Sequence, residues 1–323
     1  MKPAPYKITA LIYPIERHVG HWACSSASID LDRIVMEGDQ LESHVEGRLL
    51  DTMPHAIAII GKQVNEYNDL LDRITRKHPS LAGIPRIYRC QNTVLHDRAK
   101  GRPRTKAYLS TLDHWYKNAT DPRFDLILVQ TLTDVELMAE TLAPTLVAPC
   151  PYGYDTEIFH GQCDELERKT DVGCYFNLRN DNRRATLVEK AEQICRKHDW
   201  SFNFTCGHYW HDYARLIRTT KVCLHHTDKN EIPFRIYETS CFGTVFISDH
   251  MGCHIEKLFE KDVEYLTYKD DFSDLENVLT SVLDDTPRWK AISQAARKRA
   301  SSYTWSHIAE EYVVPALKTL LGW

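Results

Sequence analysis

The sequence has no long apolar run. No stretch of its 323 residues reaches the roughly 18–20 consecutive apolar residues that a bilayer-spanning helix needs. Residues 1–14 contain only a short apolar stretch and no small-residue cleavage site, so we interpret them as the first core strand and not as a signal peptide. We therefore expect a cytoplasmic protein without membrane insertion.

Paired metal-ligand spacings are also absent. None of the ten cysteines forms a C-x-x-C pair, which favours reduced thiols over disulfides or structural zinc. The pair His208 and His211 and the segment 250–254 (HMGCH) each lack a second ligand pair, so we predict no metal site. The sequence also lacks a strong excess of positive charge, because it has 40 Lys and Arg and 45 Asp and Glu. This balance argues against a general polyanion binder.

The sequence does contain a regular alternation of β-rich and helical patterns. This alternation predicts two successive α/β units with parallel sheets, with ligands bound at the carboxyl ends of the strands in a cleft. The junction falls in residues 149–170. The predicted strands are residues 6–14, 55–60, 85–90, 124–130, 145–149, 171–176, 201–206, 221–226 and 244–248. The predicted helices are residues 64–77, 106–117, 186–198, 210–219, 234–242, 275–283, 288–302 and 306–321.

The densest functional signal is residues 231–249, EIPFRIYETSCFGTVFISD. A strand ending near His226 leads into a helix beginning around Pro233, and proline suits a first helical turn because its missing N–H would have no partner there. The N–H groups at such a helix start favour a phosphate, and Arg235 adds a bidentate donor. Glu238, one turn further on, would accept hydrogen bonds from the two hydroxyls of a ribose. The alternative is an ordinary packed helix with Arg235 and Glu238 as a surface ion pair.

This stretch resembles the donor-binding motif of group 1 glycosyltransferases, particularly the spore-maturation-protein-like branch. That branch has an arginine followed shortly by Phe/Tyr-Glu, which here are Arg235, Tyr237 and Glu238. The broader group places seven residues between an acidic residue and the glutamate, whereas Glu231 and Glu238 have six between them. The resemblance implies that Glu238, Tyr237 and Glu231 bind a nucleotide-diphosphate sugar.

A phosphate loop is the second element of the resemblance. Residues 171–184 resemble the first strand and phosphate loop of the donor domain, where an arginine and a lysine contact the diphosphate. Arg179 and Arg184 have that spacing, with Arg183 and Asn177 as neighbouring donor contacts. The alternative is a solvated helix start, although cations at a helix N-terminus oppose its dipole and invite an anion.

The resemblance also implies the domain organisation. Residues 149–159 match the Gly-x-Asp-x-x-x-Phe hinge pattern, and the chain end resembles the closing helices of the family. We expect a GT-B fold of two Rossmann-like α/β domains facing a cleft. The domains are 1–155 on the acceptor side, 156–305 on the donor side, and a helix at 306–323 that crosses back to the first domain.

The first domain matches the family only as a strand–helix pattern. Many relatives have a glycine-rich loop after the first strand, and residues 16–24 offer only Gly20, flanked by His18. A solvated loop is at least as good an interpretation of that segment. Relatives place a histidine after a later strand to contact the donor sugar, and His96 is the candidate, with a satisfied or solvent-facing histidine as the equal alternative.

Residues 98–106 (RAKGRPRTK) form a basic segment. The simpler interpretation is a solubilising loop, and the alternative is a clamp for a phosphorylated or nucleic-acid acceptor. The acceptor candidates are Arg102, Arg104, Lys106 and His18.

We therefore predict a hexosyltransferase-like glycosyltransferase, retaining and without metal or cofactor, acting on an unidentified acceptor. Because a departing nucleoside diphosphate gains negative charge, fixed cations would lower the barrier. The alternatives are a phage-type base glucosyltransferase using the basic segment and a non-catalytic nucleotide-binding protein of the same fold. The predicted catalytic residues are Arg179, Arg184, Arg235 and His96.

Overall fold

The computed structural model divides the chain into two compact units, which are described separately below. Unit 1 comprises Met1–Tyr152 and Trp305–Trp323, and unit 2 comprises Gly153–Thr304. The structure describes residues 4–12, 26–37, 41–61, 64–90, 117–130, 132–160, 168–178, 182–208, 210–227, 232–249 and 255–322.

Unit 1 is built on a six-stranded sheet in which every pair of neighbouring strands is parallel. In spatial order the strands are β2 (Ile29–Val35), β1 (Tyr6–Ile12), β3 (Ala56–Ile60), β4 (Arg86–Arg89), β5 (Leu126–Val129) and β6 (Leu146–Pro149). The strands β3 and β5 are buried along their whole length, as expected when helices cover both faces of a parallel sheet.

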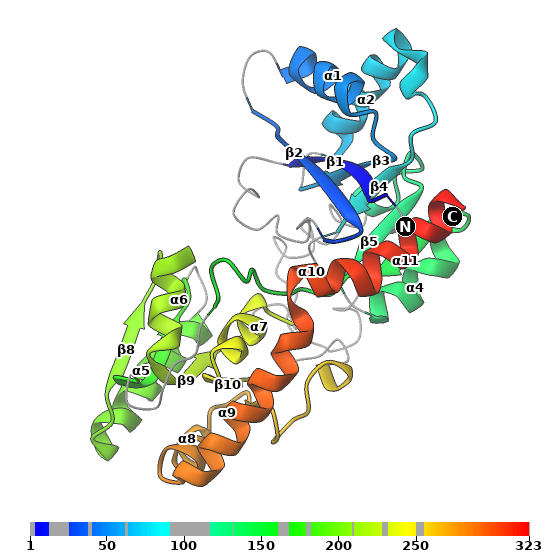
Figure 1. Ribbon diagram of the computed structural model, residues 1–323. Coiled ribbons are helices and arrows are strands. Elements are labelled where there is room, and N and C mark those ends of the chain that lie inside the picture. Colours follow the sequence, from blue (N-terminus) through cyan, green and yellow to red (C-terminus); the bar gives the residue numbers. More distant parts are fainter. Residues whose placement is uncertain are drawn as a thin grey trace. The chain divides into compact units, whose positions relative to one another are not determined.

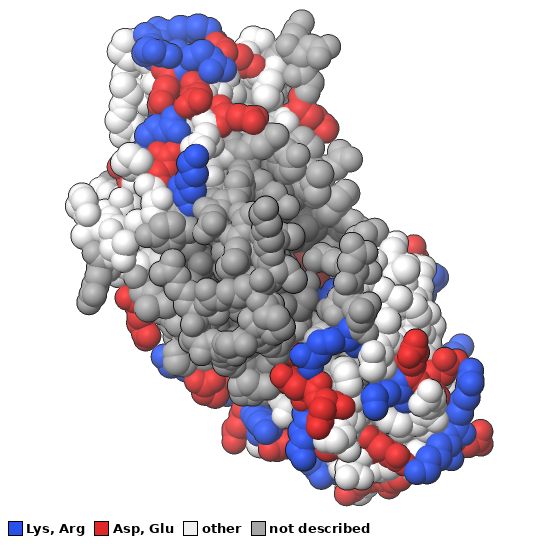
Figure 2. Space-filling model, turned by 180° about the vertical axis from the view of Figure 1, so that it is seen from behind, with Lys and Arg blue, Asp and Glu red and all other residues white. Residues whose placement is uncertain are grey.

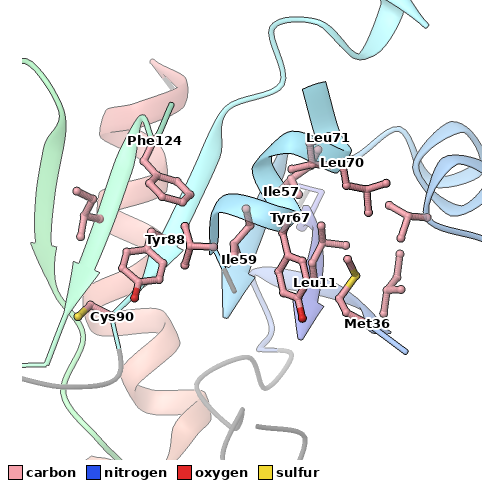
Figure 3. Packing of buried hydrophobic residues seen from close by; sticks show 14 of the residues in the cluster. Leu11, Met36, Ile57, Ile59, Tyr67, Leu70, Leu71, Tyr88, Cys90 and Phe124 are labelled. Atoms are coloured by element: carbon pink, nitrogen blue, oxygen red, sulfur yellow. The ribbon is translucent and has the colours of Figure 1, made fainter. Parts of the chain in front are cut away.

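Helices from the first 152 residues pack on this sheet through one apolar cluster. They are α1 (Leu41–Thr52), α2 (Val64–Lys77), η3 (Pro79–Leu81) and α4 (Leu132–Leu142). The side of α2 that carries Leu70, Leu71 and Ile74 is buried in the cluster. Figure 3 shows Tyr67 from α2 and Tyr88 from β4 within this core, with both hydroxyls directed toward the side where the strands end.

The chain end belongs to unit 1. It forms α10 (Trp305–Ile308), the π-helical turn η8 (Ala309–Val313) and α11 (Val314–Leu321). Glu310 fixes the segment before β2, because its carboxylate accepts hydrogen bonds from the Ser28 backbone N–H at 2.9 Å and hydroxyl at 2.8 Å. These bonds join residues far apart in the sequence into one unit.

Unit 2 contains a five-stranded sheet, also parallel throughout. Its strands in spatial order are β11 (Leu266–Thr267), β10 (Val245–Ser248), β9 (Thr220–His225), β7 (Thr170–Tyr175) and β8 (Phe202–Thr205). Its helices are α5 (Asn182–His198), α6 (Trp210–Arg218), α7 (Phe234–Cys241), η6 (Ile255–Lys257), α8 (Leu275–Leu283), α9 (Thr286–Ala300) and η7 (Ser301–Tyr303) (Figure 1).

The core of unit 2 lies where α5, α8 and α9 cover one face of its sheet. Leu187 and Ala191 of α5 and Leu279 of α8 pack there against apolar residues of β7, β9 and β10. The two apolar cores share no residue, so each unit has a core of its own.

The described surface carries both signs of charge. Figure 2 shows Lys and Arg interspersed with Asp and Glu over the described parts of one face. Within the described part of the chain, no helix combines the length and apolar character that crossing a membrane requires.

Candidate functional site

The topology of unit 2 places a ligand site at the carboxyl ends of β7 and β9. From β7 the chain passes through α5 to β8 on one side, and β9 then lies on the other side of β7. This reversal is the switch point at which open α/β sheets bind their ligands. The segments that leave the two strands there lead to the first turns of α5 and α7, which contain Arg184 and Arg235.

Arg184 joins the ends of β7 and β9. Its guanidinium donates to the Asn177 carbonyl at 3.1 Å and, through Nε and Nη2, to the His226 carbonyl at 3.3 and 3.1 Å. The side chain is buried and lies 5.5 Å from the centre of the Phe176 ring. Arg184 thus connects the residues that follow β7 and β9 and places a positive charge at this edge of the sheet.

Arg235, in the first turn of α7, is anchored on β7 and partly buried. Its Nε donates to the Tyr175 carbonyl at 3.0 Å. The Tyr175 ring lies over Gly173, where any side chain would come within 2.6 Å of that ring. Glycine at position 173 therefore allows the Tyr175 ring to pack against the backbone of β7. Tyr175 is also the residue whose carbonyl accepts the hydrogen bond from Arg235.

Glu238 lies one turn after Arg235 on α7. Burial raises the pKa of its carboxyl group to about 7, and the charge of Arg235 together with the Tyr213 hydroxyl opposes part of that rise. Tyr213 of α6 is buried, and its own pKa is raised well above the ordinary value by the same loss of solvation. The Glu238 carboxyl group is therefore partly buried, titrates near neutral pH and lies close to the positive charge of Arg235.

The predicted hinge segment, residues 149–159, packs against α6 and α7, the helices that carry Tyr213 and Glu238. Asp155 accepts a hydrogen bond from the Glu157 backbone N–H at 2.8 Å, which closes the turn after Gly153. The turn places the buried Phe159 ring 6.2 Å from Tyr213 and 6.1 Å from Phe242. Phe159 therefore packs between α6 and the end of α7.

A buried polar cluster at the ends of β9 and β10 was not predicted from the sequence. The Asp249 carboxylate is fully buried and accepts hydrogen bonds from the Thr227 N–H at 2.7 Å and the Ser248 hydroxyl at 3.0 Å. The Nδ1 of His226 lies 3.3 Å from the other Asp249 oxygen. In the sequence, the available signal was that His226 directly follows the apolar strand β9 and Asp249 directly follows the apolar strand β10.

His225 is the second missed residue. Its ring lies between Phe176 and Phe246, with centroid distances of 5.9 and 5.7 Å. Burial lowers the pKa of His225 well below its usual value, and the charges of Arg235 and Arg184 lower it further. Arg184 and Arg235 carry positive charge at this edge.

Three other predicted donor residues lie in different surroundings. Arg183 donates to the Asp270 carbonyl at 2.5 Å and lies over the Phe272 ring. Tyr237 is buried in an aromatic cluster, with its ring centroid 5.4 Å from that of Phe259 and 5.2 Å from that of Tyr303. The Asn177 side chain is exposed, and the residue contributes its carbonyl to Arg184.

Several predicted site residues lie outside the described residues. They are Arg179, His96, Glu231, Gly20, Arg102, Arg104, Lys106 and His18. The HMGCH segment also lies outside, and no group of three metal-ligating side chains occurs among the residues that are described. The expectation that the protein needs neither metal nor cofactor stays a prediction.

A comparison with protein-family models matches residues 183–313 to the family described as Glycosyl transferase-like. The matched range contains α5 apart from its first residue, all of α7 and the polar cluster at Asp249. No curated protein matches the sequence. The matched residues lie in the part of the chain for which the sequence predicts the donor domain.

Solved structures of glycosyltransferases share the fold. HepE from Anabaena in complex with UDP-glucose is 12% identical, with a TM-score of 0.61 over 97% of this chain and 99% of that one. Sucrose-phosphate synthase from Thermosynechococcus elongatus is 12% identical, with a TM-score of 0.63 over 98% and 99%. WaaG, a glycosyltransferase involved in lipopolysaccharide biosynthesis, is 12% identical, with a TM-score of 0.58 over 98% and 100%.

These likenesses extend over nearly the whole of each chain. At this level of identity they establish the fold, and the predicted GT-B fold with two Rossmann-like units is confirmed.

Proposed function

We propose that this protein is a glycosyltransferase that takes a sugar from a nucleotide-diphosphate donor bound in unit 2. The observation that carries the proposal is the convergence of Arg184, Arg235 and Glu238 at the switch point of the second sheet, inside the glycosyl transferase-like range. That edge of a parallel sheet is where nucleotides bind in such folds. We also assign the protein to the spore-maturation-protein-like branch of group 1, because of the Arg235–Tyr237–Glu238 spacing.

The two arginines have the charge and rigidity that leaving-group stabilisation requires. In the transfer step, the bond between the anomeric carbon and the diphosphate oxygen breaks and both of its electrons go to that oxygen. The acceptor hydroxyl bonds to the anomeric carbon, and its proton passes to the departing diphosphate. Cations already held in place by the carbonyls of Tyr175, Asn177 and His226 need no reorganisation when this charge develops.

Glu238 has the position and chemistry of a ribose ligand. The Glu238 carboxylate lies about one helical turn after the N-terminus of α7, where the diphosphate is proposed to bind. From there it can accept hydrogen bonds from the two adjacent hydroxyls of the ribose and so orient the donor. The arginines would supply the positive charge without a metal ion, and retention of the anomeric configuration follows from the family resemblance. Arg179 and His96 are kept in the proposal as a further diphosphate contact and a sugar contact.

The test is a thermal-shift and calorimetric screen with UDP, UDP-glucose and other nucleoside diphosphates, with UDP-glucose first because HepE binds it. We expect UDP to raise the melting temperature and the Arg235→Met variant to bind it at least about tenfold more weakly, because a charge-assisted contact is lost. The matched control is Arg215→Met on α6, whose exposed side chain pairs with Asp212.

The outcomes of this screen separate the candidates. If no nucleoside diphosphate or nucleotide sugar stabilises the protein, the proposed donor site is wrong. Binding without donor hydrolysis or transfer to any acceptor would indicate the non-catalytic nucleotide-binding protein. Transfer to DNA that is lost when Arg102, Arg104 and Lys106 are neutralised would identify the nucleic-acid-modifying enzyme.

A further inference from the structure

A buried arginine at the carboxyl end of β4 in unit 1 has no role in the donor site. Arg89 is 1% exposed. Its Nη1 donates to the Cys90 carbonyl at 2.8 Å and, at 3.5 Å, to the Leu128 carbonyl. Its Nη2 is enclosed and has no hydrogen-bond partner among the residues that the structure describes. One end of this guanidinium is therefore unsatisfied.

Across the described ranges of the chain, the charge of Arg89 also has no counter-charge. No carboxylate pairs with it in the described part of the chain, whereas Arg86 on the same strand contacts Asp72 at 2.6 Å. The buried Arg168 of unit 2 shows how carbonyls can satisfy both terminal nitrogens, with Nη1 bonded to the Thr220 carbonyl and Nη2 to the Phe242 carbonyl. An unpaired buried cation is costly, so its presence at a strand end favours a role in binding an anion.

Neighbouring strand ends bring further polar groups to Arg89. In register, Arg89 pairs with Leu128 of β5, which pairs with Ala148 of β6. Gln130 and Cys150 follow two residues later, so alternation directs all three side chains to the same face of the sheet. Both residues are buried, and the charge of Arg89 acts on the Cys150 thiol, opposing the rise in pKa that burial causes.

An aromatic ring completes this cluster. The Arg89 guanidinium lies 5.6 Å from the centre of the Tyr152 ring, which is itself buried. The contact holds the guanidinium plane in one orientation, which fixes the direction of the Nη2 donors.

We propose that Arg89 is an oxyanion-binding residue of unit 1, and that the acceptor of the transfer reaction carries a phosphate or a carboxylate. The binding of an oxyanion at Arg89 stands by itself. Only its meaning for the acceptor rests on the proposed glycosyltransferase function. The enclosed, unsatisfied Nη2 of Arg89 carries N–H donors for an oxygen of a phosphate or carboxylate, and the charge of the guanidinium strengthens such a hydrogen bond.

The direct test follows arginine side-chain NMR signals of the full-length protein, labelled with [15N]arginine, during titration with inorganic phosphate. The Arg89 Nε–H signal is identified by its loss in Arg89→Met and, independently, in Arg89→Lys. We expect this signal to shift saturably. The Arg86 signal, identified through Arg86→Met, should stay in place because Asp72 already occupies that guanidinium.

Acetate at the same ionic strength distinguishes the two classes of acceptor. A larger effect of phosphate indicates a phosphorylated acceptor, and a larger effect of acetate indicates a carboxylate. If the Arg89 signal moves with neither anion, the proposal is wrong. A simultaneous shift of the Arg235 signal would then show that the donor site binds phosphate and that only the inference about Arg89 has failed.

Thermal unfolding provides a second readout that does not depend on assigning signals. In phosphate-free buffer we expect Arg89→Met to melt no lower than the parent protein, because it removes an uncompensated buried charge. Arg86→Met should melt lower, because it leaves Asp72 without its partner. The saturating anion should add about 2 °C less to Arg89→Met than to Arg86→Met. A large loss of stability in Arg89→Met without anion would mean that Arg89 is structural and would overturn the proposal.

Discussion

At the scale of single residues, Glu238 links the chemistry of the site to pH. Its pKa of about 7 in the folded protein lies above the ordinary value of 4.5 because the carboxyl group is buried. Between these two values the folded protein keeps a proton that the unfolded chain releases. Stability therefore falls as pH rises through this window, and the full cost of burying the charge is present above pH 7.

The prediction is that Glu238→Gln is more stable than the parent protein at pH 8, by roughly 1–3 kcal/mol, and that the difference disappears near pH 4.5. Urea unfolding between pH 4.5 and 8.5 measures it. Affinity for UDP should change in the opposite direction, because the ionised carboxylate is the stronger acceptor for ribose hydroxyls. Calorimetry should show parent binding strengthening from pH 6 to pH 8 and the variant showing no such change. Parallel pH profiles of the two proteins would contradict the role of Glu238.

The same residues show how far sequence reasoning reaches at the site. Arg235 and Glu238 were recognisable because both lie on one short helix and their spacing is local. Arg184 was also selected, but the spacing does not reveal that its guanidinium is bonded to the carbonyls of Asn177 and His226. The contact between His226 and Asp249 depends on β9 and β10 being neighbours, which is a property of the sheet.

At the scale of elements, the end of α7 depends on a glycine. Gly243 has a φ of +71°, and its N–H donates to the Ser240 carbonyl at 2.8 Å, which is a left-handed helix end. A Cβ on Gly243 would lie 2.6 Å from the Ser293 hydroxyl oxygen, and that hydroxyl donates to the Gly243 carbonyl at 2.5 Å. The turn therefore excludes side chains both by conformation and by contact with α9.

We expect Gly243→Ala to lose about 2–4 kcal/mol of stability, from backbone strain together with the collision against α9. Gly207→Ala is the matched control, because Gly207 has a φ of +75° with nothing within 4 Å of its Cβ position. The control should lose only about 1 kcal/mol. Urea unfolding compares the two variants, and equal losses would show that the contact with Ser293 contributes nothing.

The predicted elements were most accurate where the apolar pattern was strong. Residues 275–283 were predicted as a helix and form α8 with the same bounds. Strand β2 was not predicted, since IDLDRIV carries three charged residues, and its place at the sheet edge allows several of its side chains to reach solvent. The single helix predicted over 306–321 is interrupted by the π-helical turn η8 directly before α11, which has Pro315 in its first turn. Proline lacks the N–H that a continuous helix would use there.

At the scale of the whole molecule, the two units differ in how the chain builds them. Unit 2 is one continuous segment, whereas unit 1 combines the first 152 residues with the chain end. The chain enters and leaves unit 2 at neighbouring points, because the Tyr154 N–H donates to the Tyr303 carbonyl at 3.0 Å. A short link can therefore replace unit 2 without distorting unit 1.

These connections predict different behaviour for the separated parts. Residues 153–304 alone should fold, unfold in one cooperative transition and bind UDP within about tenfold of the full chain, because the second core and the residues proposed to bind the diphosphate and ribose lie inside the segment. Residues 1–152 alone should not fold, because they lack the helices that follow Thr304 and the contact of Glu310 with Ser28.

The control for the last prediction is a chain in which a short Gly/Ser link joins residue 152 to residue 305. We expect this chain to regain a cooperative thermal transition, measured by circular dichroism, while showing no affinity for UDP in calorimetry. A folded 1–152 segment would mean that the chain end is dispensable for unit 1. UDP binding by the linked chain would place the donor site in unit 1 and contradict its assignment to the edge formed by β7 and β9. Folding and binding are measured separately, so an error in the division into units can be distinguished from an error in the location of the donor site.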